Sequence, residues 1–591
     1  MNSHSRFSSI ISFAIVVLCL TAQAVADTNS NAAIRARPAD ITAYNIPGGG
    51  VVTGAGIGII QIDTEVSKLH PGLAGRIQFQ TDFTPEGALT PDTEFFTYNS
   101  GANKNIWVND FHGTAVAGVM AGNGLDSGNI QTNGVGVAPG AKIIVGKMWT
   151  SQLDKNDPTY GTQALMKLSV LNGPNDPFRV AILEDQSNGG AAADGSGIFA
   201  MAADYVAFAR NITIVIPSGN SGSPTGGVPF SRPADAYNGI SVGATDSTYL
   251  KVVDFSNAGT TGDGRRKPEV VAPGQNINMP FGGWEDDDGR DASAAYPYNS
   301  PINPVLANFR APIITPAQDA DQDYQTADGT SFAGPHVAGQ VALLQEYGRA
   351  FNLNIHPQTM KAIVVNSADK LNNVLEMNKT ILDKGGNNWT SSPAFTSRTI
   401  PLDNDMGAGQ VDVWRSLKQY AAGQFSPGTI PDIGWDYHSL GAQGDSYDYV
   451  FSNAIAKDTY VSATLDWRRE ITFNDANNDG LYDPGNDTFA ARAADVLYMY
   501  LMPKTSNNIA DAIWSSISDV DNLQHIFFKV PQLGDYKLRV KFQTDNASAE
   551  TNYGLAWWTT TVPEPGTFAL MSLAMSAAGL VRRSRPRSSA G

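Results

Sequence analysis

The sequence is nearly free of cysteine: Cys19 is the single one among 591 residues. It lies in an N-terminal stretch with a positive charge at Arg6, an apolar run over residues 10–20 and small residues up to Ala26. This order is typical of a signal peptide that is removed on export, so residues 1–26 are predicted to be one. The exported chain would then hold no thiol and no disulfide, and its stability must come from core packing, with or without bound metal.

The sequence also lacks basic stripes over most of its length. Its 40 Lys and Arg residues are scattered and are outnumbered by 57 Asp and Glu, which leaves a net charge of −17. This balance argues against nucleic acid as a partner. The apolar runs at the two ends, 10–20 and 568–581, are shorter than the ~20 residues of a membrane span. Membrane contact is therefore predicted only through the signal peptide and the C-terminal tail.

The C-terminal tail has a distinctive order. Pro563, Glu564 and Pro565 precede the apolar run 568–581, which is followed by four arginines, Arg582, Arg583, Arg585 and Arg587. Basic residues after an apolar segment stay on the cytoplasmic side of a membrane. The order resembles the PEP-CTERM sorting tail of Gram-negative bacteria; a plain C-terminal anchor is the alternative. The resemblance implies that an exosortase-type enzyme processes residues 561–591 and that the protein is extracellular or at the cell surface of a Gram-negative bacterium.

Continuous apolar runs predict an α/β fold with a mostly parallel sheet. Residues 56–63 form such a run and end in Asp63, as a strand covered on both faces does. Four more strands are predicted at 141–148, 180–183, 212–216 and 239–244. Helical patterns lie between them, notably at 113–121 and 197–210. Alternation of strands and helices predicts helices on both faces of the sheet.

Residues 328–339 combine a serine with small residues and precede an apolar helical run. Pro335 fits the first turn of a helix, where its missing N–H costs nothing, so Ser331 is expected at or just before the helix N-terminus. The positive end of the helix dipole favours developing negative charge there, which suits a nucleophile. The alternative is a helix cap with glycines for close packing.

Three local patterns follow one another along the chain: a strand ending in Asp63 and helix starts at His112 and Ser331. Singly, each residue is more often structural than catalytic, but Asp, His, Ser is the chain order of the subtilisin triad. The chain resembles subtilisin-like serine proteases (subtilases) over about residues 53–420. Residues 216–222 resemble the oxyanion-hole segment of that family, with Asn220 as the side-chain donor.

The resemblance implies a secreted serine endopeptidase acting on polypeptide substrates. Ser331 would attack the peptide carbonyl, His112 would accept its proton and Asp63 would orient the imidazole. Asn220 and the Ser331 backbone N–H would bind the oxyanion, and this chemistry requires no metal or organic cofactor. The alternative from another class is a non-catalytic surface protein that keeps the scaffold and binds extracellular matrix through its C-terminal domain.

Residues 182–190 occupy the place where the family pairs an extended substrate. The resemblance assigns substrate binding to Ser187, Asn188 and Gly189, together with Gly219. The neighbouring pair 184–185, Glu-Asp, is unusual in a strand that should be buried. Three interpretations stay open: the two carboxyl groups favour basic side chains in the substrate, bind an ion, or face solvent at the strand end.

Two folded domains are predicted between the two ends of the chain. A polar lead-in, residues 27–52, is expected to be flexible because it contains three successive glycines, 48–50. The catalytic domain is predicted at 53–425, with insertions at about 74–108 and 275–327. Residues 426–560 are predicted to form an antiparallel β-sandwich from short β-rich runs at 461–467, 496–501, 525–530, 536–542 and 553–559.

One segment of the predicted sandwich has the spacing of a calcium loop. Oxygen-bearing side chains alternate with other residues, with Gly480 at the sixth position, and the candidate ligands are Asp475, Asn477, Asp479 and Asp483. The twelfth position holds Asn486 instead of a bidentate glutamate, and no flanking helices are predicted. A structural Ca²⁺ is therefore the hypothesis, and a plain turn rich in Asn, Asp and Gly is the alternative.

Overall fold

The structure is a computed structural model of the chain. It describes residues 27–66, 70–83, 97–99, 105–107, 111–125, 134–148, 158–171, 178–185, 193–222, 233–280, 285–286, 324–546 and 550–560. The predicted signal peptide, the predicted sorting tail and most of the two predicted insertions lie outside these ranges. Among the helices within them, none is long and apolar enough to cross a membrane.

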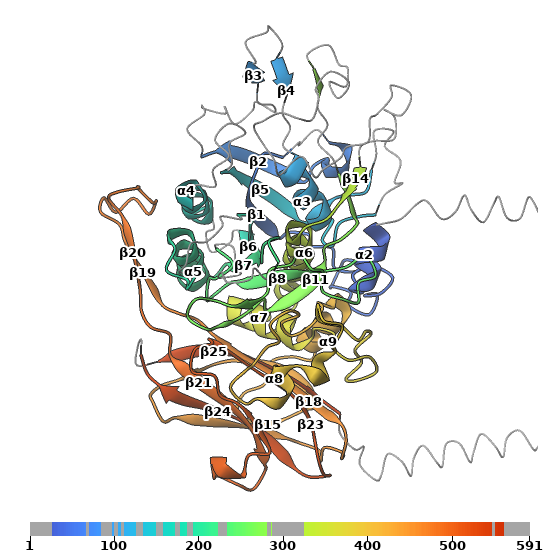
Figure 1. The fold of residues 1–591 in the computed structure, drawn as a ribbon, viewed down its shortest axis with the longest axis vertical. Helices are drawn as coiled ribbons and strands as arrows, with labels where there is room; N and C mark the ends of the chain where they lie inside the picture. The colour runs from blue at the N-terminus through green and yellow to red at the C-terminus, as the bar shows by residue number, and fades with distance from the viewer. Residues whose placement is uncertain are drawn as a thin grey trace, which may run out of the picture.

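A seven-stranded parallel sheet forms the centre of the N-terminal part (Figure 1). Across the sheet the strands are β11 (Val270–Pro273), β8 (Ile240–Thr245), β7 (Thr213–Pro217), β6 (Phe178–Leu183), β1 (Gly58–Asp63), β5 (Lys142–Lys147) and β2 (Ile77–Asp82). Each neighbouring pair is parallel. β2 lies inside the segment 74–108 that was interpreted as an insertion. That interpretation is wrong for its first residues, because they extend the sheet next to β5.

Helices cover both faces of this sheet, which confirms the predicted fold class. α3 (Phe111–Ala121) and α6 (Thr330–Ala350) pack on one face, and α4 (Pro158–Ser169) and α5 (Ile198–Arg210) pack on the other. Successive side chains of a strand point to opposite faces. Accordingly, Ile59 of β1 joins the core under α3 and α6, whereas Ile60 and Ile62 join the core under α4 and α5. The continuous apolar strands of the sequence are therefore buried on both sides.

The long helix α6 runs through this core, and its first nineteen positions are buried except for Tyr347. It begins after Gly329, so Ser331 is its second residue, as expected. Pro335 does not lie in the first turn, as predicted, but is the sixth helical residue. A proline there has no N–H for the carbonyl of Ser331, four residues earlier. The helix tolerates the missing hydrogen bond because the turns before and after Pro335 are packed in the core.

The N-terminal lead-in is packed instead of flexible over its first half. It begins with α2 (Asp27–Ala33), and Ile34 is fully buried. The buried Ser30 hydroxyl lies 3.1 Å from Nε2 of His336 in α6. Arg35 Nε donates to Asp412 Oδ2 at 2.7 Å. The glycines at 48–50 are exposed. The segment before them is held by side-chain contacts, which the presence of three glycines does not predict.

Residues 428–559 form two packed sheets, as predicted. One sheet holds β15 (Gly428–Ile430), β17 (Ser446–Phe451), β24 (Tyr536–Thr544), β21 (Val496–Pro503) and β22 (Trp514–Ser516). The other holds β16 (Ile433–Leu440), β25 (Thr551–Thr559), β18 (Tyr460–Trp467) and β23 (Leu523–Lys529). All pairs are antiparallel except β15 with β17. Side chains from both sheets form one core that includes Leu465, Leu538 and Trp557.

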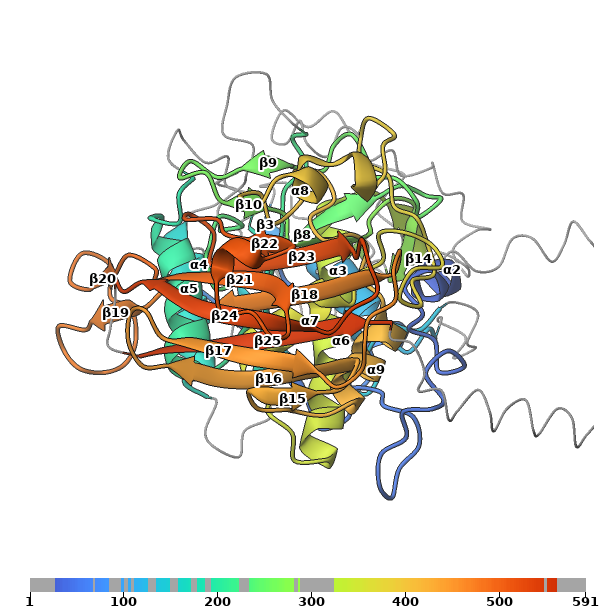
Figure 2. The ribbon, with the colours of Figure 1, turned by 90° about the horizontal axis from the view of Figure 1, so that it is seen from below.

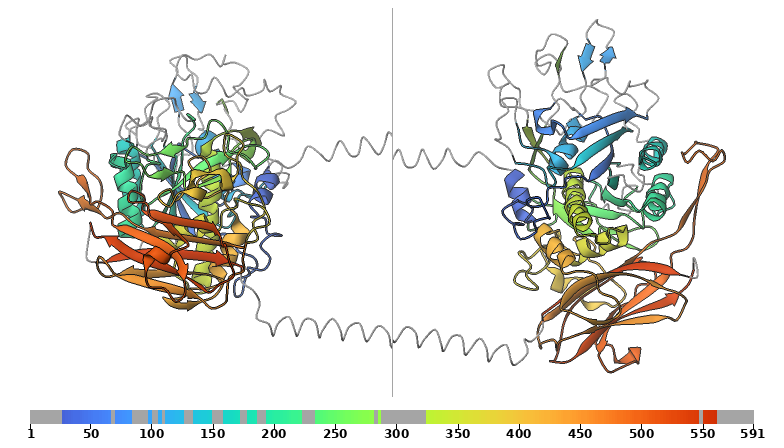
Figure 3. Two further views of the ribbon diagram at one scale, coloured as in Figure 1. Left: turned by 60° about the horizontal axis from the view of Figure 1, so that its bottom comes forward. Right: turned by 180° about the vertical axis from the view of Figure 1, so that it is seen from behind.

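The sandwich is joined to the N-terminal part by close packing. α7 (Pro357–Asn366) and α9 (Val413–Ala421) lie against the sheet that contains β16, β25 and β18 (Figures 2 and 3). A Cβ on Gly554 would lie 2.4 Å from the Gln358 carbonyl oxygen, so α7 rests directly on β25. Ser462 Oγ of β18 donates to Asn366 Oδ1 of α7 at 2.8 Å. The sheet is thus covered on both faces.

An arm of the sandwich, formed by β19 (Ile471–Asn474) and β20 (Thr488–Ala491), extends along α5 (Figure 1). The rings of Phe473 and Phe489 lie 5.6 and 6.0 Å from that of Tyr205 in α5. Just before the arm, Arg468 donates to the carbonyls of Ala207 and Phe208, near the C-terminal end of α5. These contacts hold the arm to the N-terminal part.

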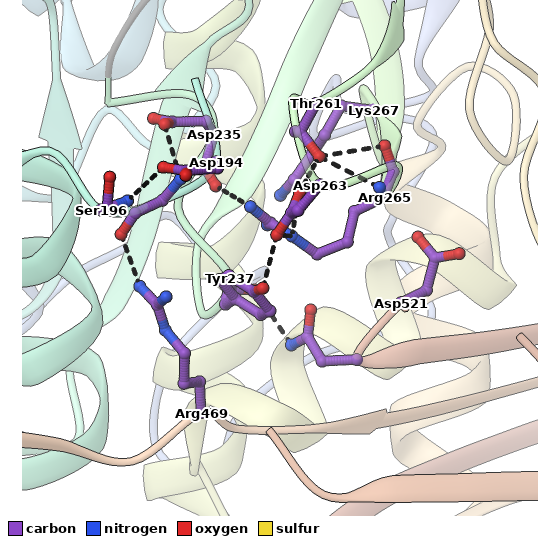
Figure 4. A network of polar contacts seen from close by, with 12 residues as sticks. Asp194, Ser196, Asp235, Tyr237, Thr261, Asp263, Arg265, Lys267, Arg469 and Asp521 are labelled. Atoms are coloured by element: carbon purple, nitrogen blue, oxygen red, sulfur yellow. Dashed lines mark hydrogen bonds and ion pairs between the residues drawn. The ribbon is translucent and has the colours of Figure 1, made fainter. Parts of the chain in front are cut away.

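A polar network lies at the foot of this arm (Figure 4). The Tyr237 ring lies between two guanidinium groups, those of Arg265 at 3.4 Å and Arg469 at 4.0 Å from its centroid. Arg265 also pairs with Asp263, and the Tyr237 hydroxyl donates to that same carboxylate. Arg469 belongs to the sandwich and the other three to the N-terminal part, so the network spans the two.

The remaining elements are short. They are η1 (Pro71–Leu73), β3 (Thr97–Asn99), β4 (Asn105–Trp107), β9 (Gly259–Thr260), β10 (Arg266–Lys267), β12 (Ile277–Pro280), β13 (Glu285–Asp286), β14 (Tyr324–Ala327), η5 (Trp389–Ser391), α8 (Pro393–Thr396) and η6 (Ile509–Asp511).

Candidate active site

The predicted site residues gather at the carboxyl edge of the parallel sheet. Asp63 ends β1, and Asn220 lies in the loop that follows β7. The amino ends of α3 and α6 bring His112 and Ser331, each the second residue of its helix. Groups at this edge of an α/β sheet come from several strands and meet in one crevice. The fold therefore brings four residues distant in sequence to one region.

Asp63 and His112 form a hydrogen-bonded pair. The carboxylate Oδ1 lies 2.7 Å from Nδ1 of the imidazole. Asp63 is fully buried, and it also accepts hydrogen bonds from the Thr64 backbone N–H at 2.6 Å and the Gln61 side-chain amide at 2.9 Å. About a quarter of the His112 side chain (24%) is exposed, which leaves the ring accessible. The buried carboxylate thus holds Nδ1 and fixes the orientation of the ring.

The start of α3 is held by the same strand end. The Gly113 backbone N–H donates to Thr64 Oγ1 at 2.7 Å, and its carbonyl accepts from the Gln61 amide at 2.8 Å. A Cβ at Gly113 would lie 2.6 Å from the Glu65 carbonyl oxygen. Glycine is therefore required after His112, because any side chain would push the helix away from β1 and lengthen the pair between Asp63 and His112.

Asn220 is oriented by the residue that precedes Ser331. Its Oδ1 accepts from the Thr330 backbone N–H at 2.8 Å and from Thr330 Oγ1 at 2.9 Å. A backbone N–H only donates, so the amide oxygen must face Thr330, and the amide N–H groups face the other way. Thr330 Oγ1 also accepts from the Gly219 N–H at 3.1 Å, and Gly219 has a φ of +105°, which favours glycine.

Ser331 is 2% exposed and lies in the first turn of α6. The ring of the next residue, Phe332, lies 5.9 Å from the His112 imidazole. The positive end of the helix dipole lies beside the serine. This turn can therefore supply both a nucleophile and hydrogen-bond donors for an oxyanion.

Sequence reasoning did not assign Glu184 to this site. Glu184 follows β6, whose neighbour β1 ends in Asp63, and its backbone N–H donates to the Ile62 carbonyl at 2.9 Å. It is 1% exposed, as is Asp185, so the solvent-facing interpretation of this pair is wrong. The sequence feature that could have identified Glu184 is the pair of acidic residues directly after β6, the strand that pairs with β1.

The Glu184 carboxyl group faces the candidate triad. Ile182, two residues earlier on the same side of the strand, lies under α6, where a Cβ on Gly334 would be 3.4 Å from its Cδ1. Within the described residues, neither carboxyl oxygen of Glu184 has a hydrogen-bond partner. Burial raises the pKa of Glu184 well above its ordinary value, and the negative charge of Asp63 raises it further. His112 and the Ser331 hydroxyl act in the opposite direction. Glu184 is therefore expected to hold a proton.

The predicted substrate-binding residues are only partly within the described residues. Gly219 lies at the end of β7, beside Thr330, as given above. Ser187, Asn188 and Gly189 lie outside the described residues.

The candidate calcium loop connects β19 with β20, at the tip of the arm. Asp475 accepts from the backbone N–H groups of Asn478 and Gly480, each at 2.7 Å. The Asn477 amide donates to Asp483 at 2.8 Å and to Asp479 at 3.2 Å. Within the described part of the chain, no group of three or more His, Cys, Asp or Glu side chains is arranged to hold a metal ion. Calcium binding by this loop stays a prediction.

Comparison with known proteins identifies two family patterns. The sequence model of the subtilase family matches residues 54–387, more than half of the chain. The model of the PEP-CTERM protein-sorting motif matches residues 561–585.

Several curated proteins are similar to the catalytic part. Bacillopeptidase F of Bacillus subtilis (strain 168) is 28% identical over 326 residues, which are 54% of this chain and 19% of that protein. Serine protease AprX of the same organism is 27% identical over 334 residues, 54% of this chain and 63% of that protein. An extracellular protease of Xanthomonas campestris pv. campestris is 26% identical over 336 residues, 54% of this chain and 48% of that protein. The chain spans less than two thirds of the length of each. On the extent of the family match and on its fold, this chain belongs to the subtilase family.

Proposed function

We propose that the protein is an exported serine endopeptidase. The observation that carries the proposal is the 2.7 Å pair between Asp63 Oδ1 and His112 Nδ1, at the sheet edge where the α6 turn bears Ser331. A histidine whose Nδ1 is held by a buried carboxylate presents Nε2 as a base, which is what an adjacent serine needs. The names of the relatives, all proteases, support the same class.

The mechanism assigns one role to each residue. Ser331 Oγ attacks the peptide carbonyl while His112 Nε2 accepts its proton, and the imidazolium then protonates the leaving amine. Asp63 keeps the ring in the tautomer with hydrogen on Nδ1 and stabilises its charged form. Water then hydrolyses the acyl-enzyme by the reverse route. No metal or organic cofactor takes part in these steps.

Two donors stabilise the tetrahedral oxyanion in this mechanism. They are the Asn220 side-chain amide and the Ser331 backbone N–H. The hydrogen bonds from Thr330 to Asn220 Oδ1 orient the amide N–H groups away from Thr330 before substrate arrives. Such preorganisation means that little reorganisation is needed during reaction. In a subtilisin, loss of the asparagine donor costs about 3 to 4 kcal/mol of transition-state stabilisation.

Processing and location follow from the ends of the chain. We infer that residues 1–26 are a signal peptide and that the host is a Gram-negative bacterium. An exosortase-type enzyme of that host acts on residues 561–591. The PEP-CTERM motif supports the inference about this enzyme. The mature protein would comprise the lead-in 27–52, the catalytic domain 53–425 and the β-sandwich 426–560. A structural Ca²⁺ at Asp475, Asn477, Asp479 and Asp483 is part of this proposal.

Fluorophosphonate labelling of the purified protein tests the function directly. We expect the wild type to react covalently and Ser331→Ala to be unreactive, with both proteins folded. Hydrolysis of an unfolded protein substrate such as casein should disappear in the same variant. A folded wild type that neither labels nor hydrolyses, with or without calcium, would favour the non-catalytic protein that binds extracellular matrix. A Ser331→Ala protein that cleaves as fast as the wild type would show that the triad is assigned wrongly.

A further inference from the structure

Glu184 is a buried carboxyl group that the mechanism above does not use. It follows β6, is 1% exposed and lies on the side of that strand where Ile182 packs under the start of α6, and neither of its carboxyl oxygens has a hydrogen-bond partner among the residues that the structure describes. A buried carboxyl group without well-aligned partners is costly unless it is neutral or serves the site. Glu184 is beside the nucleophile itself, so its protonation state bears on the reacting oxygen.

The charged groups around Glu184 come from several elements. β1 contributes Asp63, α3 contributes His112, and Asp185 follows in the chain as a second buried carboxyl group. On the far side of β1, Lys147 of β5 lies 3.7 Å from a carboxylate oxygen of Glu65 and 3.7 Å from one of Asp82.

Asp63 lies 2.7 Å from His112 Nδ1 and accepts hydrogen bonds from the Thr64 backbone N–H and the Gln61 side-chain amide. Two neighbouring buried carboxyl groups cannot both ionise at low cost, because each negative charge disfavours the other. Glu184 is the group of the pair that keeps its proton, in agreement with the upward shift of its pKa. The resting site then carries one negative charge near the imidazole instead of two.

We propose that Glu184 is a fourth catalytic residue, which acts as a neutral carboxylic acid and donates a hydrogen bond to Ser331 Oγ; this inference rests on the proposed serine endopeptidase function. With Oγ accepting from Glu184, the hydroxyl hydrogen of Ser331 is left to point at His112. That is the orientation from which the imidazole removes it. The acid does not transfer its proton during attack; it sets the direction of the serine hydroxyl.

Ionisation of Glu184 reverses this hydrogen bond. The carboxylate can only accept, so the Ser331 hydroxyl turns toward it and away from His112. A second negative charge also lies beside the forming oxyanion and opposes it. The enzyme is therefore active with Glu184 protonated, and its rate falls as pH rises through the ionisation of this group. For a single ionisation that abolishes activity, the fall is about tenfold per pH unit.

The test is the pH dependence of the second-order rate of fluorophosphonate inactivation, which needs no knowledge of the natural substrate. Four proteins are compared: wild type, Glu184→Gln, Glu184→Leu and the matched control Asp185→Asn. Glutamine keeps a neutral donor that cannot ionise, and leucine removes the donor at similar volume. Asp185→Asn removes the adjacent buried carboxyl group. Circular dichroism at each pH shows which samples are folded.

We expect the wild type and Asp185→Asn to lose rate on the alkaline side, and Glu184→Gln to keep its rate there. Glu184→Leu should also lack the alkaline fall but react about five- to tenfold more slowly at every pH, since one hydrogen bond of about 1 kcal/mol is lost. Rescue by glutamine but not leucine separates a donor to Ser331 from a role in packing.

The outcomes separate this inference from the proposed function. If the wild type reacts through Ser331 but shows no alkaline fall up to about pH 10, where lysine and tyrosine begin to titrate, Glu184 has no such role. A fall that persists unchanged in folded Glu184→Gln overturns the inference as well. If Glu184→Gln does not fold, the wild-type profile alone decides. In each of these cases the serine protease assignment stands, and only absence of any labelling removes both.

Discussion

Among the contacts between the sandwich and the catalytic part, the one made by Arg469 is predicted to contribute most to the free energy of unfolding. Its side chain is 6% exposed and donates to Asp204 at 2.5 Å and to the Gly195 carbonyl at 2.7 Å. Asp204, in α5, is fully buried. Besides Arg469, its carboxylate accepts from the backbone N–H groups of Tyr237 at 3.3 Å and Asn238 at 2.7 Å. Among these contacts to Asp204, only the one with Arg469 is to a positively charged group.

Arg469→Met removes this charge and keeps most of the side-chain volume. Breaking a buried pair leaves the other charge uncompensated and costs about 3 to 5 kcal/mol. That is a large share of the roughly 5 to 15 kcal/mol by which folded domains are stable. The double variant Arg469→Met/Asp204→Asn removes both charges. It should be more stable than the sum of the two single changes predicts, by about 1 to 3 kcal/mol.

Urea denaturation of the four proteins measures these free energies. Tryptophan fluorescence reports on both parts, since Trp389 is buried in the catalytic part and Trp435, Trp467 and Trp557 in the sandwich, whereas residual activity reports on the catalytic part alone. We expect one transition by both probes, because the two parts share a core and a polar network. A cost below about 1 kcal/mol for Arg469→Met, or strict additivity in the double variant, would refute the reasoning. Two separate transitions would show that the sandwich unfolds alone.

Three further predictions concern the site, acid stability and metal. Asn220→Ala should lower kcat by about 10²- to 10³-fold with little change in KM, since its donor acts mainly on the transition state; steady-state kinetics that show a raised KM alone would contradict this. Burial lowers the pKa of His336 to about 4. The unfolded chain therefore takes up this proton first as pH falls, and stability should drop by about 3 kcal/mol between pH 6.5 and 4. Folded His336→Gln should lack that part of the drop in urea titrations at the two pH values. Calcium should raise the melting temperature of the wild type but not of Asp475→Ala; equal shifts in both would place the ion elsewhere.

The sequence by itself determined the fold class and the order of the site residues. The apolar run that ends in Asp63 and the glycine-rich helix starts at His112 and Ser331 are local patterns, and each follows from local physical rules. A strand buried on both faces must be continuously apolar, and a helix that begins against a strand end needs small residues there. Asn220 was identified differently, from the resemblance of residues 216–222 to the oxyanion-hole segment of the subtilases.

Only the tertiary structure decided which polar groups are buried. Glu184 could not be placed from its neighbours, since its burial depends on the pairing of β6 with β1 and on α3 and α6 closing over that edge. The packed lead-in likewise depends on a contact between Ser30 and His336, 306 residues apart. The ion pair of Arg469 with Asp204 joins residues 265 apart. Contacts over such separations leave no local pattern in the chain, so they appear only when the whole fold is assembled.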